Sequence, residues 1–169
     1  MVAAPPFIPM EVSAWDPAGA LWCAANDEYR LLRIGFDRLD TLSRIERPVA
    51  PDRIPDAERD AAIAKVKKQF EGATEVSADY SAVPRTRPFF VSLSVDDAGR
   101  LWARRARADT LAIEFDVFSR EGRHLATVTG RGRAAQYAPR PVIRGDDVYL
   151  VLRDADDVPF VARYRASAP

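Results

Sequence analysis

Arginines gather in the second half of the chain. Between Arg100 and Arg144 the sequence has ten arginines and four acidic residues, although positive and negative residues balance at 25 each over the whole chain. A guanidinium can donate a forked pair of hydrogen bonds to a carboxylate or a phosphate. Because Arg104, Arg105 and Arg107 lie on or next to one loop between two expected strands, we predict that they form an anion site if this loop opens on the central cavity of the fold. The alternative is that they are ordinary strand-flanking arginines, since the chain prefers arginine to lysine throughout.

His124 and Cys23 are the residues suited to nucleophilic or metal chemistry, and each is the only one of its kind in the chain. His124 follows a Glu-Gly-Arg turn, where we expect it to face solvent, so we expect neither a Ser-His-Asp triad nor a two-histidine metal site. A cysteine nucleophile needs a nearby base, and no histidine lies near Cys23 in the sequence. Cys23 is therefore interpreted as a small buried strand residue, and it cannot form an internal disulfide.

Carboxylates cluster in short segments that are typical of hairpin turns. An aspartate in a turn bonds the backbone of its own turn, and no segment has the ligand spacing of an EF-hand. We therefore expect no bound metal and no cofactor. The residues concerned are Asp96, Asp97, Asp146, Asp147, Asp154, Asp156 and Asp157.

The elements that must position these side chains follow a repeat. The segment WDPAGALW, residues 15–22, has the same Asp, Gly and Leu-Trp spacing as VDDAGRLW, residues 95–102. An Asp-x-x-Gly stretch makes a tight turn whose glycine tolerates a positive φ, and the Leu-Trp pair begins the next strand. We predict that Trp22, Trp102 and the less similar Tyr149 occupy equivalent packing positions between sheets.

Apolar and polar residues alternate around these turns and predict short antiparallel strands in three units. The first two units have four strands each, whereas the third has three and lacks the fourth strand of the others. We place the units at residues 7–46, 88–130 and 141–166. The expected strands are 7–12, 20–25, 29–36, 41–45, 89–95, 101–105, 111–118, 124–129, 142–143, 148–152 and 160–164.

A helix is predicted between the first and second units, over residues 55–71. Acidic residues crowd its first turns and three lysines its last, and Gly72 offers a stop. Its apolar stripe of Ile63, Val66 and Phe70 is narrow, which indicates a surface helix that lies on the sheets. We favour a packed insertion over a lid above a ligand. Proline-rich segments on either side would carry the chain out and back.

Repeated four-stranded units of about 40 residues are typical of β-propeller blades. The segments SLSVDDAGRLWARR, EFDVFSREGRHLATV, VIRGDDVYLVLRD and VARYR resemble the carboxy-terminal blades of bacterial six-bladed β-propellers related to NHL-repeat proteins. The resemblance covers most of the chain from about Trp15 onward, and the helical insert with VPRTRPFF resembles an element of some such propellers. It implies an all-β fold in a single domain, residues 1–169. This fold is a partial β-propeller with two full four-stranded antiparallel blades, an incomplete third and one inserted surface α-helix.

A six-bladed ring needs about 240 residues at this repeat length, so three blades cannot close around an axis. The two end faces would expose apolar surface and strand edges. We interpret the chain as the carboxy-terminal half of such a propeller, whose partner is the missing set of amino-terminal blades. The alternative is that two copies associate into a six-bladed ring.

The repeat and the lack of a complete catalytic set favour a non-enzymatic module that binds a small anionic ligand or a protein partner across one face. The rival hypothesis is a lactonase-like or lyase-like propeller enzyme with further site residues in other blades. The resemblance extends to calcium-dependent hydrolases of the gluconolactonase type, whose acidic and amide ligands gather at the axis. This chain has one asparagine, Asn26, which makes such a cage hard to build from this half.

Composition argues against other classes of partner. The net charge is zero, so no overall field attracts nucleic acid or an anionic membrane. No segment approaches the roughly 18 apolar residues of a membrane span. The amino-terminal MVAAPPFIPM lacks the basic region and the uninterrupted apolar core of a signal peptide. The resemblance is compatible with export of a longer form, and the residues present leave the compartment open.

Overall fold

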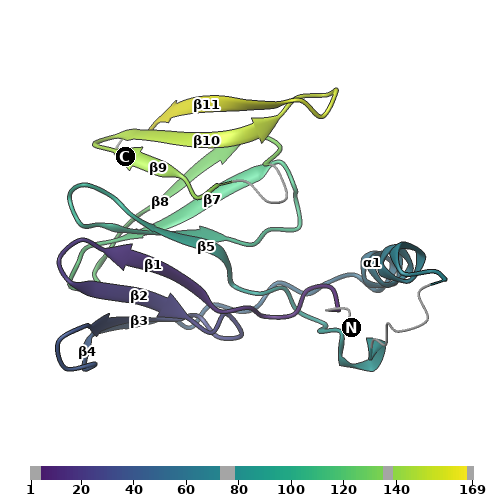
Figure 1. The fold of residues 1–169 in the computed structure, drawn as a ribbon, viewed down its shortest axis with the longest axis horizontal. Helices are drawn as coiled ribbons and strands as arrows, with labels where there is room; N and C mark the ends of the chain where they lie inside the picture. Colours follow the sequence, from purple (N-terminus) through teal and green to yellow (C-terminus); the bar gives the residue numbers. More distant parts are fainter. Residues whose placement is uncertain (1–4, 73–78, 135–138, 167–169) are drawn as a thin grey trace.

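The computed structural model describes residues 5–72, 79–134 and 139–166. Over these residues the chain is mostly β, with eleven strands in three antiparallel sheets, one α-helix and one short 3-10 helix. None of the three sheets closes on itself. Figure 1 shows the sheets stacked in chain order, with the helix far to one side. No helix in the described part of the chain is long and apolar enough to cross a membrane.

The first sheet consists of four strands, which neighbour one another in chain order: β1 (Val12–Asp16), β2 (Ala20–Ala24), β3 (Arg30–Gly35) and β4 (Thr41–Glu46). The last three lie within two residues of their predicted bounds. The strand expected at residues 7–12 is wrong, because the chain enters the sheet only at Val12. Three prolines before Met10 cannot donate to a ladder, and the tight turn at Asp16 requires the preceding strand to run directly into it.

The second and third sheets match the predicted strands to within two residues. In the described residues the third sheet has three strands. The second sheet is β5 (Phe90–Val95), β6 (Leu101–Arg105), β7 (Ala112–Phe118) and β8 (His124–Arg131), and the third is β9 (Val142–Arg144), β10 (Asp147–Arg153) and β11 (Pro159–Arg165).

The repeated Asp-x-x-Gly segments form the same turn twice. The Gly19 N–H donates to the Asp16 carbonyl at 3.1 Å, and the Gly99 N–H donates to the Asp96 carbonyl at 3.0 Å. Both glycines have a positive φ, 79° and 77°, where a side chain is strained. Each aspartate also accepts a hydrogen bond from the backbone two residues on, at 2.9 and 3.0 Å. The turn chemistry predicted from the repeat is therefore confirmed.

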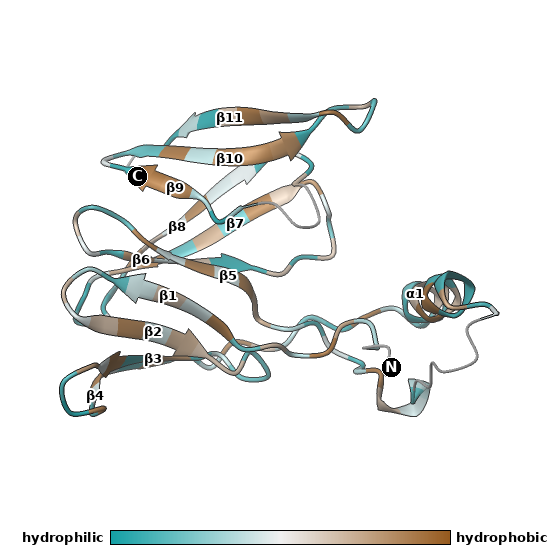
Figure 2. Ribbon diagram, in the orientation of Figure 1, coloured by the Kyte–Doolittle hydropathy of each residue, from teal (hydrophilic) through white to brown (hydrophobic). Residues whose placement is uncertain are grey.

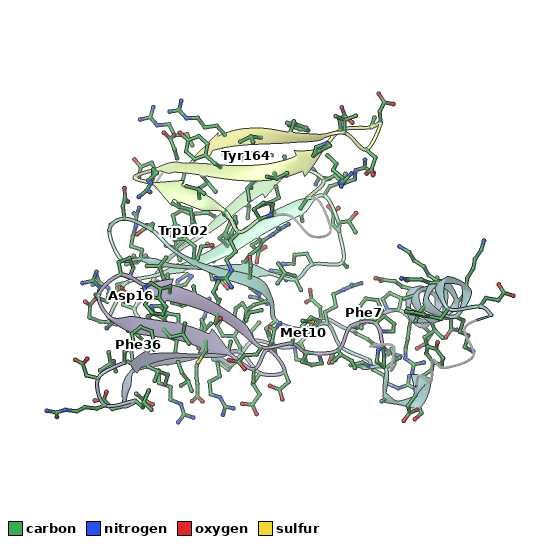
Figure 3. All side chains as sticks on the ribbon, in the orientation of Figure 1. Phe7, Met10, Asp16, Phe36, Trp102 and Tyr164 are labelled. Atoms are coloured by element: carbon green, nitrogen blue, oxygen red, sulfur yellow. The ribbon has the colours of Figure 1, made fainter. Side chains whose placement is uncertain are left out.

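The sheets pack through two separate hydrophobic cores. Trp22 of β2 is fully buried between the first and second sheets, where it joins the core that contains Leu93, Leu101 and Phe118. Trp102 of β6 is buried between the second and third sheets (Figure 3). The predicted equivalence of the two tryptophans is thus confirmed. Figure 2 shows the hydrophobic stretches along β2, β9 and β10 that contribute to these cores.

The three sheets approach one another through their first strands. Strand β1 contacts β5, and β5 contacts β9, so the first strands lie next to one another although they are far apart in the sequence. At the opposite side of the sheets, a hydrogen bond from Ser43 to the Glu121 carbonyl, 3.0 Å long, joins β4 to the β7–β8 turn. The second sheet is therefore covered on both faces, and the first and third sheets are each covered on one.

The helix α1 (Asp56–Gln69) does not lie on the sheets as expected. None of its residues is buried, and Figure 1 shows it at the end of an arm, residues 52–72 and 79–87, that extends away from the sheets. The arm begins as two paired extended segments, in which the Ile54 N–H donates to the Arg85 carbonyl at 2.9 Å and the Arg87 N–H donates to the Asp52 carbonyl at 2.8 Å. The apolar stripe of the helix is too narrow to cover a sheet face.

Contacts within the arm hold the helix in place. Arg59 of the helix donates to the carbonyls of Val83 and Tyr80, at 3.2 and 3.4 Å, beside the 3-10 helix η1 (Tyr80–Ala82). The side chains of Ile54 and Val83 are buried at the base of this unit. The arm is thus a small packed insertion with its own contacts.

Candidate functional site

A cavity of about 340 Å³ opens where the arm joins the second sheet. Its lining includes all three arginines that the sequence predicts for an anion site, Arg104, Arg105 and Arg107. Arg87, at the base of the arm, is the fourth arginine of the lining. Apolar walls complete it, among them Phe7, Pro88 and Val91. We call this the arginine cavity.

Arg105 belongs to the structure that supports the cavity. It is buried, and its Nη1 lies 3.1 Å from Oδ2 of Asp116 on the neighbouring strand β7. Its Nε donates to the Phe89 carbonyl at 3.2 Å, and its guanidinium lies over the ring of Tyr29 at 5.0 Å from the centroid. Arg105 is therefore held by a carboxylate, a carbonyl and an aromatic ring between the first and second sheets, and it is a poor ligand for a further anion.

Asp116 is the acceptor at the centre of a buried polar network between the first and second sheets. It accepts hydrogen bonds from the Tyr29 hydroxyl at 2.5 Å and from the Thr127 hydroxyl at 2.7 Å, in addition to Arg105. Burial alone would raise the pKa of this carboxyl, but the hydrogen bonds from Tyr29, Thr127 and Arg105 hold it below its usual value. Burial of the Tyr29 hydroxyl and its hydrogen bond to Asp116 raise the pKa of Tyr29.

Arg107 is also paired. Its two terminal nitrogens contact Glu114 of β7 and Asp52 of the arm, the latter at 3.3 Å. Partial burial lowers the pKa of Arg107, and the contacts with these two carboxylates outweigh that effect and raise it. Because Arg107 joins the second sheet to the arm, its position fixes one wall of the cavity.

Arg104 differs from the other arginines of the cavity because no carboxylate among the described residues pairs with it. It is half-buried in β6, and among the residues that the structure describes it has no ion pair and donates no hydrogen bond. Burial lowers the pKa of its guanidinium, which means that the surroundings disfavour the charge. A half-buried cation without a counter-charge is a natural ligand for an anion from solution.

Arg87 is a cavity residue that the sequence reasoning missed. Its guanidinium is buried, contacts Glu58 of α1 and lies over the Phe7 ring, 5.6 Å from the centroid. Its Nε is buried without a hydrogen-bond partner in the described part of the chain. Arg87 lies in the segment VPRTRPFF, and nothing in this segment indicates that it lines a cavity, because its position depends on the pairing of the arm segments.

The charges around the arginine cavity leave one positive charge without a partner. Arg87, Arg105 and Arg107 each have a carboxylate partner, whereas Arg104 has none among the described residues. The acidic residue of the lining, Asp109, pairs with Arg131 at 3.4 Å. The site therefore suits a ligand with a single negative charge better than one with two.

The other residues considered from the sequence form no comparable site. His124 is partly exposed, and its Nε2 lies 3.7 Å from Oδ1 of Asp116. Cys23 is half-buried. Asp96 accepts a hydrogen bond from the indole N–H of Trp102 at 2.9 Å. Asp154 accepts backbone hydrogen bonds within its own turn, as expected for a turn aspartate. Within residues 5–72, 79–134 and 139–166, no three histidine, cysteine or acidic side chains come together as metal ligands would.

A second cavity, of about 390 Å³, lies between β1 and β5. Its lining is mixed, with Ile8, Met10 and Phe90 beside Glu11 and Arg140. It does not gather like charges or unpaired buried donors, so the arginine cavity is the stronger candidate.

The chain matches no protein-family model, and no curated protein is similar to it in sequence. The arginine cavity must therefore be interpreted from its own chemistry.

Proposed function

We propose that this chain is a non-enzymatic binding module whose arginine cavity takes a small monocarboxylate with an apolar body. The observation that carries this proposal is the half-buried Arg104, which has no counter-charge among the described residues and lines the same cavity as Arg87. The guanidinium of Arg104 offers forked donors to one carboxylate. Phe7, Pro88 and Val91 offer apolar contact to the rest of the ligand.

The chemistry of the lining supports binding in preference to turnover. Arginine remains protonated at physiological pH, so it can hold an anion but cannot serve as a general base. The carboxylates nearest the cavity are engaged with arginines. The proposal therefore assigns recognition to the cavity.

We further propose that the three sheets are blades of a six-bladed propeller of the NHL-repeat-like type, of which this chain forms half. The adjacent first strands, the twice-repeated Asp-turn and the buried tryptophan that each of the first two sheets directs into the next support this interpretation. In this architecture the arginine cavity lies beside the loop between the second and third strands of the second blade.

A binding titration tests the ligand class. We expect benzoate to bind more tightly than acetate, because its ring contacts the apolar wall, and both to bind more tightly than sulfate, because one positive charge is unpaired. The variant Arg104→Met is expected to weaken benzoate binding at least tenfold, as loss of a charged hydrogen bond does. Arg123→Met, an exposed arginine at the other end of β7, is the matched control and is expected to bind like the wild type. Equal binding of benzoate by the wild type and Arg104→Met, or no binding by either, would overturn the proposal.

A further inference from the structure

The first sheet carries an apolar surface on the face that points away from the second sheet. Trp15 is 64% exposed and stacks on Phe36 with ring centroids 4.4 Å apart. Leu21 is the cross-strand partner of both Trp15 and Ile34, so these side chains share a face, opposite to the buried Trp22. None of them belongs to either buried core. We call this the first outer face; it comprises Trp15, Leu21, Cys23, Leu32, Ile34 and Phe36.

The third sheet carries a matching surface on its far side. Val148, Leu150 and Leu152 of β10 are buried against the second sheet, so the alternate residues Tyr149 and Val151 point away from it. Their cross-strand partners share this face and include Val142, 54% exposed, and Val161, 69% exposed. We call this the third outer face; it comprises Tyr149, Val151, Val142 and Val161.

The internal repeat indicates what fits these faces. Leu21 of β2 corresponds in the repeat to Leu101 of β6, and their cross-strand partners are Trp15 and Val95. In the second sheet this face is covered by the first sheet, and Leu101 is fully buried there. The first outer face is therefore the counterpart of a surface that accepts a neighbouring sheet.

The third outer face corresponds to the other half of the same contact. Trp22 and Trp102 each point from their own sheet into the next one. Tyr149 lies on the corresponding side of the third sheet, where no further sheet follows in the described residues. The first outer face thus corresponds to the side of the second sheet that packs on the preceding sheet. The third outer face corresponds to the side that packs on the following sheet.

We propose that a second copy of this chain covers both faces, with the first outer face of each copy packed on the third outer face of the other. A twofold axis relates the two contacts, and the result is a closed ring of six sheets. A closed pair buries all four apolar faces, whereas a single head-to-tail contact leaves two of them in water. This inference concerns surfaces away from the arginine cavity and does not depend on the ligand.

The mass in solution tests the ring. The wild-type chain is expected to sediment at twice its 18.8 kDa. Trp15→Glu and Val161→Glu are each expected to reduce the mass to that of one chain, because each places a charge in both contacts of the ring. Leu111→Glu, at an exposed leucine before β7 that lies on neither outer face, is the matched control and is expected to remain a dimer. Circular dichroism of each variant reports that the sheets have folded.

Mixing the two monomeric variants gives a sharper test. A ring made of one Trp15→Glu chain and one Val161→Glu chain has one contact with both faces intact, so the mixture is expected to regain dimer mass. A dimer that joins two first outer faces would instead survive Val161→Glu, and its survival would overturn the proposed pairing. A monomeric wild type, or species heavier than two chains, would overturn the ring. Arg104→Met is expected to keep dimer mass, so this test fails or succeeds independently of the ligand proposal.

The thiol reactivity of Cys23 provides a second test of the ring, and it requires no engineered cysteine. It is the only cysteine and lies half-buried on the first outer face. Its reaction with a thiol reagent is expected to be at least tenfold slower in the wild type than in Val161→Glu, since the partner's third sheet covers it in the ring. Val161 and Cys23 lie in different sheets of one chain, so Val161→Glu is expected to change the reaction rate of Cys23 only by removing the second copy. An equal rate in the two proteins would contradict the proposal.

Discussion

The Tyr29 hydroxyl donates a hydrogen bond to Oδ2 of Asp116 at 2.5 Å, across the interface between the first and second sheets. Asp116 also accepts from Arg105 at 3.1 Å, so one carboxylate fixes the loop before β3 and the end of β6 to β7. Arg47 lies 3.6 Å from the same carboxylate. The interface that is otherwise made of aromatic and aliphatic side chains therefore contains a charged centre whose protonation matters for stability.

Asp116→Asn is expected to lower the free energy of unfolding by ~3 kcal/mol at pH 7, because it leaves the buried Arg105 without its counter-charge. The folded-state pKa of Asp116 is depressed, so the stability that the carboxylate supplies is present above its unfolded value of about 3.9 and is lost as the pH falls through the folded value. Urea unfolding between pH 7 and pH 2 should show a shallower acid loss in the variant than in the wild type. Asp156→Asn, at an exposed turn residue, is the control. An unchanged acid limb in Asp116→Asn would contradict this account.

The two equivalent tryptophans differ in one hydrogen bond, which gives a paired prediction. The Trp102 indole N–H donates to Asp96 at 2.9 Å, whereas the Trp22 indole N–H is buried without a partner in the described part of the chain. Both lose similar volume on replacement by phenylalanine. Trp102→Phe should therefore cost ~1 kcal/mol more than Trp22→Phe in chemical denaturation. Equal losses would show that the Asp96 bond contributes nothing.

Arg104→Met should stabilise the protein while it removes the ligand. A half-buried guanidinium without a counter-charge is disfavoured by its surroundings, and methionine fills similar space without a charge. We expect the free energy of unfolding to rise by ~1 kcal/mol. Added benzoate should raise the Tm of the wild type and leave that of Arg104→Met unchanged. A destabilised variant would mean that Arg104 has a structural partner.

Removal of the helix should leave the sheets intact. None of the α1 residues is buried, and the arm segments 52–54 and 85–87 pair without it. Replacing residues 56–82 by a short Gly-Ser linker is expected to shift the Tm by less than ~4 °C, since Arg87 then exchanges Glu58 for water. Far-ultraviolet circular dichroism and a melting curve measure this. Loss of cooperative unfolding would show that the arm is part of the core.

Sequence reasoning succeeded where local chemistry decides the structure. The turns at Asp16 and Asp96, their glycines and the strand after each are fixed by residues within one hairpin. It failed at residues 7–12, where apolar composition suggested a strand and the prolines, with the turn downstream, shifted the strand to Val12. It also placed the helix on the sheets, because periodicity shows which side of a helix is apolar but not what covers it.

The three arginines grouped from the sequence line one cavity, where the arm joins the second sheet, and their role as an anion site stays a prediction. The positions of Arg104, Arg105 and Arg107 around one cavity followed from their spacing beside a single loop. Their division of roles did not, since it depends on carboxylates distant in the sequence: Asp116 pairs with Arg105, and Asp52 with Arg107. Arg87 reaches the cavity only because the arm folds back, which no local pattern encodes.

Because the second sheet lies between the other two, substitutions in it are expected to affect stability more than substitutions in the first or third sheet. Strand β7 has Ile113, Phe115 and Val117 in one core and Phe118 in the other, so its two faces serve two interfaces at once. A destabilising substitution in β10 disturbs the packing between the second and third sheets only. A destabilising substitution in β7 disturbs the packing at both interfaces. Among substitutions that leave the two outer faces unchanged, those in the second sheet should thus be the least tolerated.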